Sequence, residues 1–141
     1  AGALTATEYA IKAGQRYGKA LGGNCEEIIP DIIDYGTTVI ETMQPYQNDI
    51  KKMKDLYGKK VVFNGGWDSY GPHNEVNATE DMIRGEVRRI VDEYFYDGNF
   101  IMYGGCMYPA SVPMGIFIEH NGWVDDELRT YSQAYIKKHF G

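Results

Sequence analysis

An α/β domain of about four β/α units is the fold class that the sequence predicts. Short apolar or β-branched runs alternate with amphipathic helical stretches along the chain. Apolar strands joined by helices are typical of a parallel sheet, because each parallel connection needs a crossover. A closed eight-unit barrel needs about 250 residues, so these 141 residues predict a half-barrel of the TIM type. Such a half is a fragment or pairs with a second half, unless its strands form an open sheet.

Capping residues and apolar periodicity place the elements of the first half. We expect a helix, a very short strand, a second helix and a second strand at residues 5–18, 20–24, 25–35 and 37–43. Thr5 or Thr7 suits the N-cap of the first helix, and Asn24 suits that of the second. Gly36 ends the second helix, because glycine adopts the left-handed conformation found just after many helices.

The second half of the chain repeats this alternation. We expect a helix, a strand, a loop, a helix, a strand and a final helix at residues 48–58, 61–64, 65–68, 79–94, 100–103 and about 125–139. Thr79 suits the N-cap of the fourth helix, where Glu80 and Asp81 complement the positive end of the helix dipole.

The composition is that of one globular domain, which we expect to span residues 1–141. Hydrophobic residues make up 43% of the chain and charged residues 24%, with a formal net charge of -6. An acidic chain without a basic stripe argues against nucleic acid as a partner, and no apolar run is long enough to cross a membrane. The chain starts without a signal-peptide pattern and its two cysteines suit reduced thiols, so we expect a cytoplasmic location.

Five motifs follow one another with regular spacing. They are the stretches 26–36 (EEIIPDIIDYG), 43–47 (MQPYQ), 49–58 (DIKKMKDLYG), 63–68 (FNGGWD) and 100–109 (FIMYGGCMYP). Together they resemble the C-terminal half of the uroporphyrinogen decarboxylase superfamily, over most of residues 24–120. The resemblance implies a (β/α)8 barrel with one of two activities, either decarboxylation in the haem pathway or corrinoid-linked methyl transfer.

The last of these motifs separates the two activities. Decarboxylases of this kind read Gly-His-Gly-Leu-Tyr-Pro there, whereas residue Gly105 stands at the His position in this chain. The methyltransferases carry a His-x-Cys zinc motif and a further Cys in the last-strand turn. Cys106 matches that Cys, but Ala20 and Gly22 stand at the other two positions. The methyltransferase resemblance implies zinc as cofactor and a corrinoid as substrate or as the cargo of a partner corrinoid protein.

Three residues are candidates for catalysis or metal binding by their positions. Cys106 follows the end of a strand, where β/α barrels place their active sites, and a thiolate there would bind zinc; the alternative is a small buried residue in a glycine-rich corner. Asp68 also follows a strand and would orient a substrate or act as a base, or simply bond its own turn. Cys25 begins a helix, where the dipole favours a thiolate and a displaced metal ligand; an incidental cysteine is the alternative.

Aromatic residues near the strand ends are candidates for substrate binding. Trp67, Tyr70, Tyr46 and Tyr108 fall on one predicted face that would suit a flat macrocycle, and Asn64 ends the strand before Trp67. Aromatic side chains on loops are equally typical of protein interfaces. His73 is a further metal-ligand candidate in the loop over residues 69–78.

The placement of the arginines favours methyl transfer. A substrate with many carboxylates needs guanidinium partners, yet no Arg falls on a predicted strand or on the loop that follows one. We therefore expect methyl transfer from a methylated corrinoid to a thiol. The alternatives are cofactor-free uroporphyrinogen decarboxylation and, because of Ala20 and Gly22, a non-catalytic half-barrel that acts as a binding or assembly module.

The number of strands predicts a partner. Four strands would leave two open sheet edges and an uncovered apolar layer. We expect a homodimer that closes an eight-stranded barrel, or a missing N-terminal half-barrel in that place.

Overall fold

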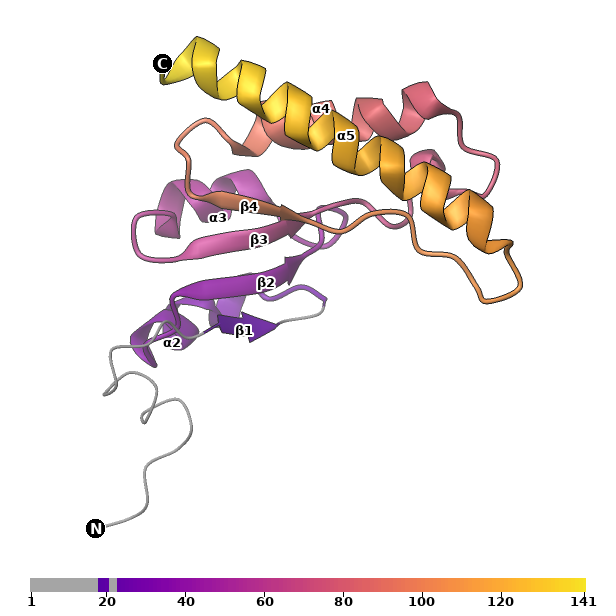
Figure 1. Ribbon diagram of the computed structural model, residues 1–141. Coiled ribbons are helices and arrows are strands. Elements are labelled where there is room, and N and C mark those ends of the chain that lie inside the picture. Colours follow the sequence, from indigo (N-terminus) through magenta and orange to yellow (C-terminus); the bar gives the residue numbers. More distant parts are fainter. Residues whose placement is uncertain (1–17, 21–22) are drawn as a thin grey trace.

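The structure is a computed structural model that describes residues 18–20 and 23–141 of the chain, and its fold is α/β (Figure 1). Over those residues a single parallel sheet runs in the order of the sequence. Its four strands are β1 (Gly18–Ala20), β2 (Val39–Met43), β3 (Val62–Gly66) and β4 (Phe100–Tyr103). The predicted parallel α/β architecture is thus confirmed.

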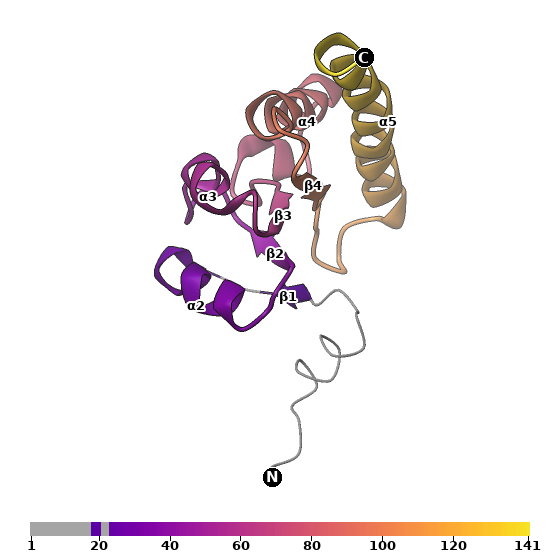
Figure 2. The same ribbon diagram turned by 90° about the vertical axis from the view of Figure 1, so that its left-hand side faces the viewer.

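Helices connect successive strands. The α-helices are α2 (Ile29–Asp34), α3 (Ile50–Tyr57), α4 (Glu80–Tyr94) and α5 (Met114–His139), and two 3-10 turns, η1 (Glu26–Ile28) and η2 (Pro72–Asn74), precede α2 and α4. Right-handed crossovers between neighbouring strands place all their helices on one face of a sheet. Figure 2 shows this arrangement, with α2, α3 and α4 on one side of the strands and α5 beside α4, beyond the edge at β4.

The core lies between the sheet and these helices. Ile40 pairs in register with Phe63, which pairs with Phe100, so three buried side chains form a row across β2, β3 and β4. Ile83 and Ile90 of α4 are fully buried in the same apolar cluster. Burying each such side chain contributes about 1.5–3 kcal/mol, which makes this layer the main source of stability.

The opposite face of the sheet is open within the described residues. Side chains alternate between the two faces of a strand, and the alternate positions of β4 are Ile101, 49% exposed, and Tyr103, 61% exposed. Glu41 on β2 is exposed as well, and Val62 on β3 is partly so. This face therefore remains available for a covering layer.

Two helix starts are capped by side chains, one of them by the predicted Thr79. The Asp49 carboxylate accepts a hydrogen bond from Lys52 N at 3.0 Å, and Thr79 Oγ1 accepts one from Met82 N at 3.3 Å. Both side chains satisfy an amide that has no partner in the first turn of a helix. The predicted helix over 25–35 divides into η1 and α2, where Pro30 occupies the first turn of α2.

Two expected elements need correction, and a third falls outside the described residues. The last helix begins at Met114 and not near residue 125, because contacts of its buried His120 and Val124 outweigh the weak helix propensity of Gly115 and Gly122. The short strand spans 18–20 instead of 20–24. The expected helix over 5–18 falls almost wholly outside the described residues.

No described helix combines the length and apolar character that crossing a membrane requires.

Candidate functional site

A pocket of about 590 Å³ opens at the carboxyl ends of β2, β3 and β4, against the first half of α5. Loops at this edge of a parallel sheet commonly carry binding sites. The lining residues are mostly apolar or uncharged, and they are Met43, Gln44, Gly65, Trp67, Ser69, Met102, Tyr103, Gly104, Gly105, Cys106, Met107, Phe117, Asn121, Val124, Asp125 and Leu128. This pocket is the candidate site.

Two glycines allow the backbone to approach closely at the pocket. Gly65 has a φ of 146°, and a Cβ there would lie 2.5 Å from the carbonyl oxygen of Met43. Gly104 has a φ of 120°, and a Cβ there would lie 2.5 Å from Cβ of Trp67. Side chains at these positions would be strained in conformation and in space, so the glycines set the shape of the pocket.

Asn74 joins the two loops that enclose the pocket. Its Oδ1 accepts hydrogen bonds from Trp67 Nε1 at 3.1 Å and from Met107 N at 3.4 Å. Its Nδ2 donates to the carbonyl oxygen of Ser69 at 3.2 Å. One side chain from η2 thus holds the loop after β3 against the loop after β4; we call this set of bonds the Asn74 clasp.

Cys106 lies inside the wall of the pocket and is only 1% exposed. Its Sγ donates a weak hydrogen bond to the carbonyl oxygen of His73 at 3.7 Å. Burial raises the pKa of the Cys106 thiol more than the hydrogen bond with Tyr108 lowers it, so the thiol is protonated at neutral pH. Both positions that the sequence suggested for Cys106 are thus found together, because the residue lines the candidate site and also fills a glycine-rich corner.

The position before Cys106 has no room for histidine. A Cβ on Gly105 would lie 2.4 Å from Oδ1 of Asn121. The Asn121 side chain is held in place because its Nδ2 donates to the carbonyl oxygens of Cys106 and Phe117, at 3.0 Å each. Asn121 therefore occupies the space that the His of a decarboxylase-like turn would need.

Asp68 caps its own turn and does not line the pocket. Its Oδ1 accepts from Tyr70 N at 2.9 Å, and its carbonyl oxygen accepts from His73 Nε2 at 2.6 Å. Its backbone N donates to Oε1 of buried Glu86 at 3.3 Å, and Arg89 binds both oxygens of that carboxylate. This network fixes the loop after β3, and it uses Asp68 and His73 as structural members.

Tyr108 lies next to the pocket but lines a smaller apolar hollow of about 310 Å³ together with Phe117. Its hydroxyl donates to the carbonyl oxygen of Glu75 at 3.2 Å and lies 2.6 Å from Nδ1 of His120. Burial, together with the hydrogen bond to Cys106, raises the pKa of Tyr108. The tyrosine is thus a neutral link between the loop after β4, α5 and the loop after β3.

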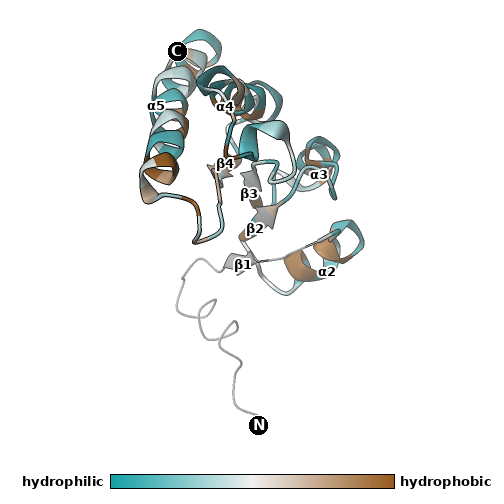
Figure 3. Ribbon diagram, turned by 90° about the vertical axis from the view of Figure 1, so that its right-hand side faces the viewer, coloured by the Kyte–Doolittle hydropathy of each residue, from teal (hydrophilic) through white to brown (hydrophobic). Residues whose placement is uncertain are grey.

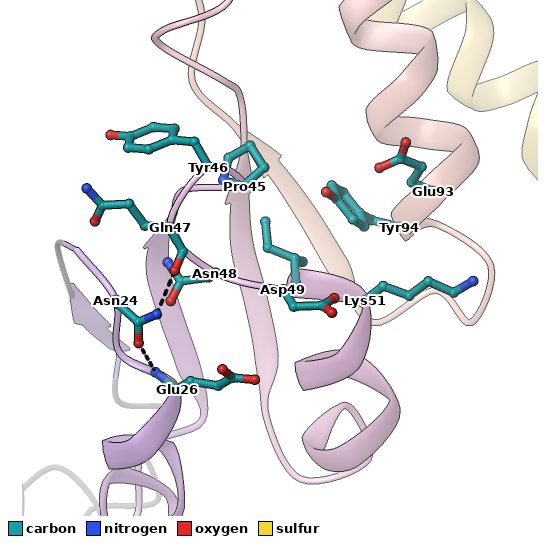
Figure 4. A pocket seen from close by; sticks show the side chains of 11 residues that line it. Asn24, Glu26, Pro45, Tyr46, Gln47, Asn48, Asp49, Lys51, Glu93 and Tyr94 are labelled. Atoms are coloured by element: carbon teal, nitrogen blue, oxygen red, sulfur yellow. Dashed lines mark hydrogen bonds between the residues drawn. The ribbon is translucent and has the colours of Figure 1, made fainter.

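Tyr46 and Tyr70 form a separate group. Their rings pack edge to face with centroids 4.5 Å apart. Tyr46 lines another, polar pocket of about 450 Å³ (Figure 4), where Asn24 Nδ2 donates to the carbonyl oxygen of Gln47 at 2.8 Å. Of the four predicted aromatic side chains, Trp67 is the one that lines the candidate site.

The two remaining predicted residues, Cys25 and Asn64, make no contact with Cys106 among the interactions described. Cys25 is buried, with its Sγ 3.8 Å from Sδ of Met43 and 3.5 Å from Oδ1 of Asn48. Burial raises the pKa of the Cys25 thiol. Asn64 lies on β3, and its Oδ1 is buried without a hydrogen-bond partner among the described residues.

The described residues do not by themselves fit a zinc ion. Nowhere in residues 18–20 and 23–141 do three His, Cys, Asp or Glu side chains gather as a ligand set. The expected ligands Cys106 and Cys25 have different neighbours, and both thiols are protonated by burial. Structural and catalytic zinc sites need at least three protein ligands.

Sequence reasoning did not find Asn74, Asn121 or Asp125. Asn121 and Asp125 are four residues apart on α5, so they share a face of the helix, but the helix was expected to begin only near residue 125. Asn74 lies in a loop whose conformation no periodicity describes. The one signal in the sequence that could have pointed to Asn74 is that its amide side chain follows the candidate His73 directly.

No protein-family model matches this chain, and curated proteins include no match to it.

Proposed function

We propose that this chain forms the C-terminal half of a TIM-type barrel that transfers a methyl group from a methylated corrinoid to a thiol. The observation that carries the proposal is the pocket at the carboxyl ends of β2, β3 and β4, with Cys106 in its wall and no lysine or arginine among its lining residues. Uroporphyrinogen carries many carboxylates and would need such cations. A corrin ring with neutral amide groups does not.

The chemistry of this proposal balances without an oxidant. A thiolate attacks the methyl carbon, the sulfur–carbon bond forms as the cobalt–carbon bond breaks, and the bonding electron pair remains on cobalt. The thiol releases its proton to solvent. In the proposal, apolar lining residues such as Met102 and Trp67 exclude water from the methyl group, and any metal would take its other ligands from outside the described residues.

The proposal is tested with methylcobalamin and 2-mercaptoethanol, by following loss of the methylcobalamin absorbance and formation of the methyl thioether. We expect thioether formation that falls at least about tenfold in Cys106→Ala and is unchanged in Cys25→Ala, which removes a thiol outside the pocket. Absence of thioether with a wild-type chain that light scattering shows to be dimeric would overturn the proposal. Binding of methylcobalamin without turnover would favour the second candidate, a non-catalytic binding module.

The binding module has its own supporting observation. The Cys106 thiol is buried and protonated, and Gly105 leaves no room for the His of the decarboxylase turn. Cofactor-free decarboxylation has no comparable support, because the described pocket offers no cation to a polycarboxylate.

A second half-barrel is the partner that this proposal requires. Ile101 and Tyr103 remain exposed on the open face of the sheet, and β1 and β4 are its two edges over the described residues. In a homodimer, β4 of each copy would pair with β1 of the other and close eight strands. Light scattering should then give twice the chain mass of 16.0 kDa; a monomer would leave the N-terminal half-barrel as the partner.

A further inference from the structure

One carboxylate at the candidate pocket has no ionic partner. α5 carries three consecutive acids, of which Asp126 and Glu127 pair with Arg84 at 2.8 and 3.0 Å. The first acid, Asp125, faces the pocket and makes no ion pair or hydrogen bond with any described residue. The two acids that face α4 are thus paired with an arginine, whereas the acid that faces the pocket is not.

No lysine or arginine lines the described pocket to compensate for the charge of Asp125. The segment between Arg89 and Arg129 contains acids but no lysine or arginine, and this segment supplies β4, its loop and the first half of α5. Arg89 binds Glu86, and Arg129 binds Asp126. The described lining is therefore mostly apolar or uncharged, with Asp125 as its one charged side chain.

Three aromatic side chains from three different elements line the same pocket. Trp67 follows β3, Tyr103 ends β4, and Phe117 lies in the first turn of α5, where Figure 3 shows the strongly hydrophobic start of the helix. The Trp67 indole is anchored by Asn74 and packs its ring against His73 with centroids 4.9 Å apart. Tyr103 is 61% exposed and Phe117 38% exposed, so these two rings are open to a ligand, whereas Trp67, 4% exposed, reaches the pocket only with the edge of its buried ring.

Aromatic rings combined with one carboxylate are a recognition set for alkylated ammonium groups. The ring quadrupole attracts a diffuse cation, and methyl groups on nitrogen tolerate an apolar wall that would repel a strongly hydrated ion. We propose that this pocket is a binding site for a small molecule that carries a tertiary or quaternary ammonium group, with Asp125 as counter-ion and Tyr103, Trp67 and Phe117 as aromatic walls. A volume of about 590 Å³ suits a molecule of that class. The site shares its pocket with the proposed methyl transfer but does not depend on that reaction.

The test compares choline with 3,3-dimethylbutan-1-ol, which has the same shape with carbon in place of the charged nitrogen. Both are titrated into the wild-type chain by calorimetry at constant ionic strength. We expect choline to bind at least about fivefold more tightly than the neutral alcohol. Equal binding, preference for the alcohol, or no binding of choline would each overturn the proposal.

Variants assign the preference to named residues. Asp125→Asn should weaken choline about threefold to tenfold and leave the alcohol unchanged, whereas Glu119→Gln, an exposed acid on α5 that does not line the pocket, should change neither. Tyr103→Leu should weaken choline about fivefold and Tyr103→Phe should not, because the ring is kept. An unchanged affinity in Asp125→Asn would refute the role of the carboxylate.

The outcome separates this proposal from methyl transfer. Choline selectivity without thioether formation leaves the ammonium site standing and rejects the reaction. Thioether formation without choline selectivity does the reverse.

Discussion

The loops around the pocket and the helix pair that carries its outer wall are held by different forces. Neutral hydrogen bonds of the Asn74 clasp join the loops after β3 and β4. By contrast, α5 docks on α4 through charge, because Arg84 and Arg88 both bind the carboxylate of Glu127 at 3.0 and 2.6 Å. Neutral bonds do not respond to pH or salt, whereas ion pairs do. The shape of the pocket mouth and the position of its helical wall are therefore separately adjustable.

The largest expected effect comes from a substitution in the loops around the pocket. Gly104→Ala places a side chain at a φ of 120° and 2.5 Å from Cβ of Trp67, so conformational strain and steric overlap together should cost about 3 kcal/mol of unfolding free energy. Urea denaturation measures it.

Gly105→Ala is the matched control. Its Cβ would meet Oδ1 of Asn121, a side chain that can give way only by disturbing its hydrogen bonds to the carbonyl oxygens of Cys106 and Phe117. We expect a cost of about 1 kcal/mol, from the disturbed Asn121 bonds. Equal costs for the two variants would show that the left-handed conformation of Gly104 and its contact with Trp67 do not matter.

The next effect tests the charged interface. Glu127→Gln removes the charge that binds two guanidinium groups, and should lower the unfolding free energy by about 2 kcal/mol at pH 7. Burial raises the pKa of the Glu127 carboxyl, but hydrogen bonds from Arg88 and Arg84 outweigh it and hold the pKa below its usual value.

The lowered pKa sets the sign of the pH dependence. A carboxylate with a depressed folded-state pKa stabilises the fold above its unfolded pKa of about 4.3, and that stability is lost as the pH falls through the folded value. The difference between wild type and Glu127→Gln should therefore shrink at acidic pH. A constant difference from pH 7 to pH 3 would argue that the glutamate acts through packing alone.

Sequence reasoning could predict the elements whose signals are local. Asp49 and Thr79 mark helix starts because a cap is a contact with the next few residues. The start of α5 was missed because Gly115 and Gly122 weaken the local signal, and the helix is held there by tertiary contacts of His120 and Val124.

The candidate site divides in the same way. Cys106 and Trp67 were expected just after strand ends, and both line the pocket. They could be predicted because apolar runs in the sequence mark where strands end. Tyr46 and Tyr70 were expected on the same face, yet they pack on each other elsewhere, because loop conformation depends on bonds between distant residues. Asp125 could not be predicted as a pocket residue, because the sequence does not show which face of α5 packs on α4 and which faces the pocket.

The smallest expected effect tests the clasp directly. Asn74→Ala leaves Trp67 Nε1 and Met107 N without their acceptor, and should cost about 1 kcal/mol, since these sites are partly open to water that replaces the bonds. Looser loops should nonetheless expose the buried Cys106 thiol more often. We expect its alkylation by iodoacetamide to accelerate about threefold to tenfold in a Cys25→Ala background.

A matched variant distinguishes the clasp from general destabilisation. Asn74→Asp keeps an oxygen for both donors and loses only the bond to the Ser69 carbonyl, so the alkylation rate should return most of the way to that of wild type. Glu127→Gln weakens the fold by a larger amount but leaves the clasp intact. If Glu127→Gln accelerates alkylation as much as Asn74→Ala does, Cys106 is exposed by global unfolding, and the two regions are not independent.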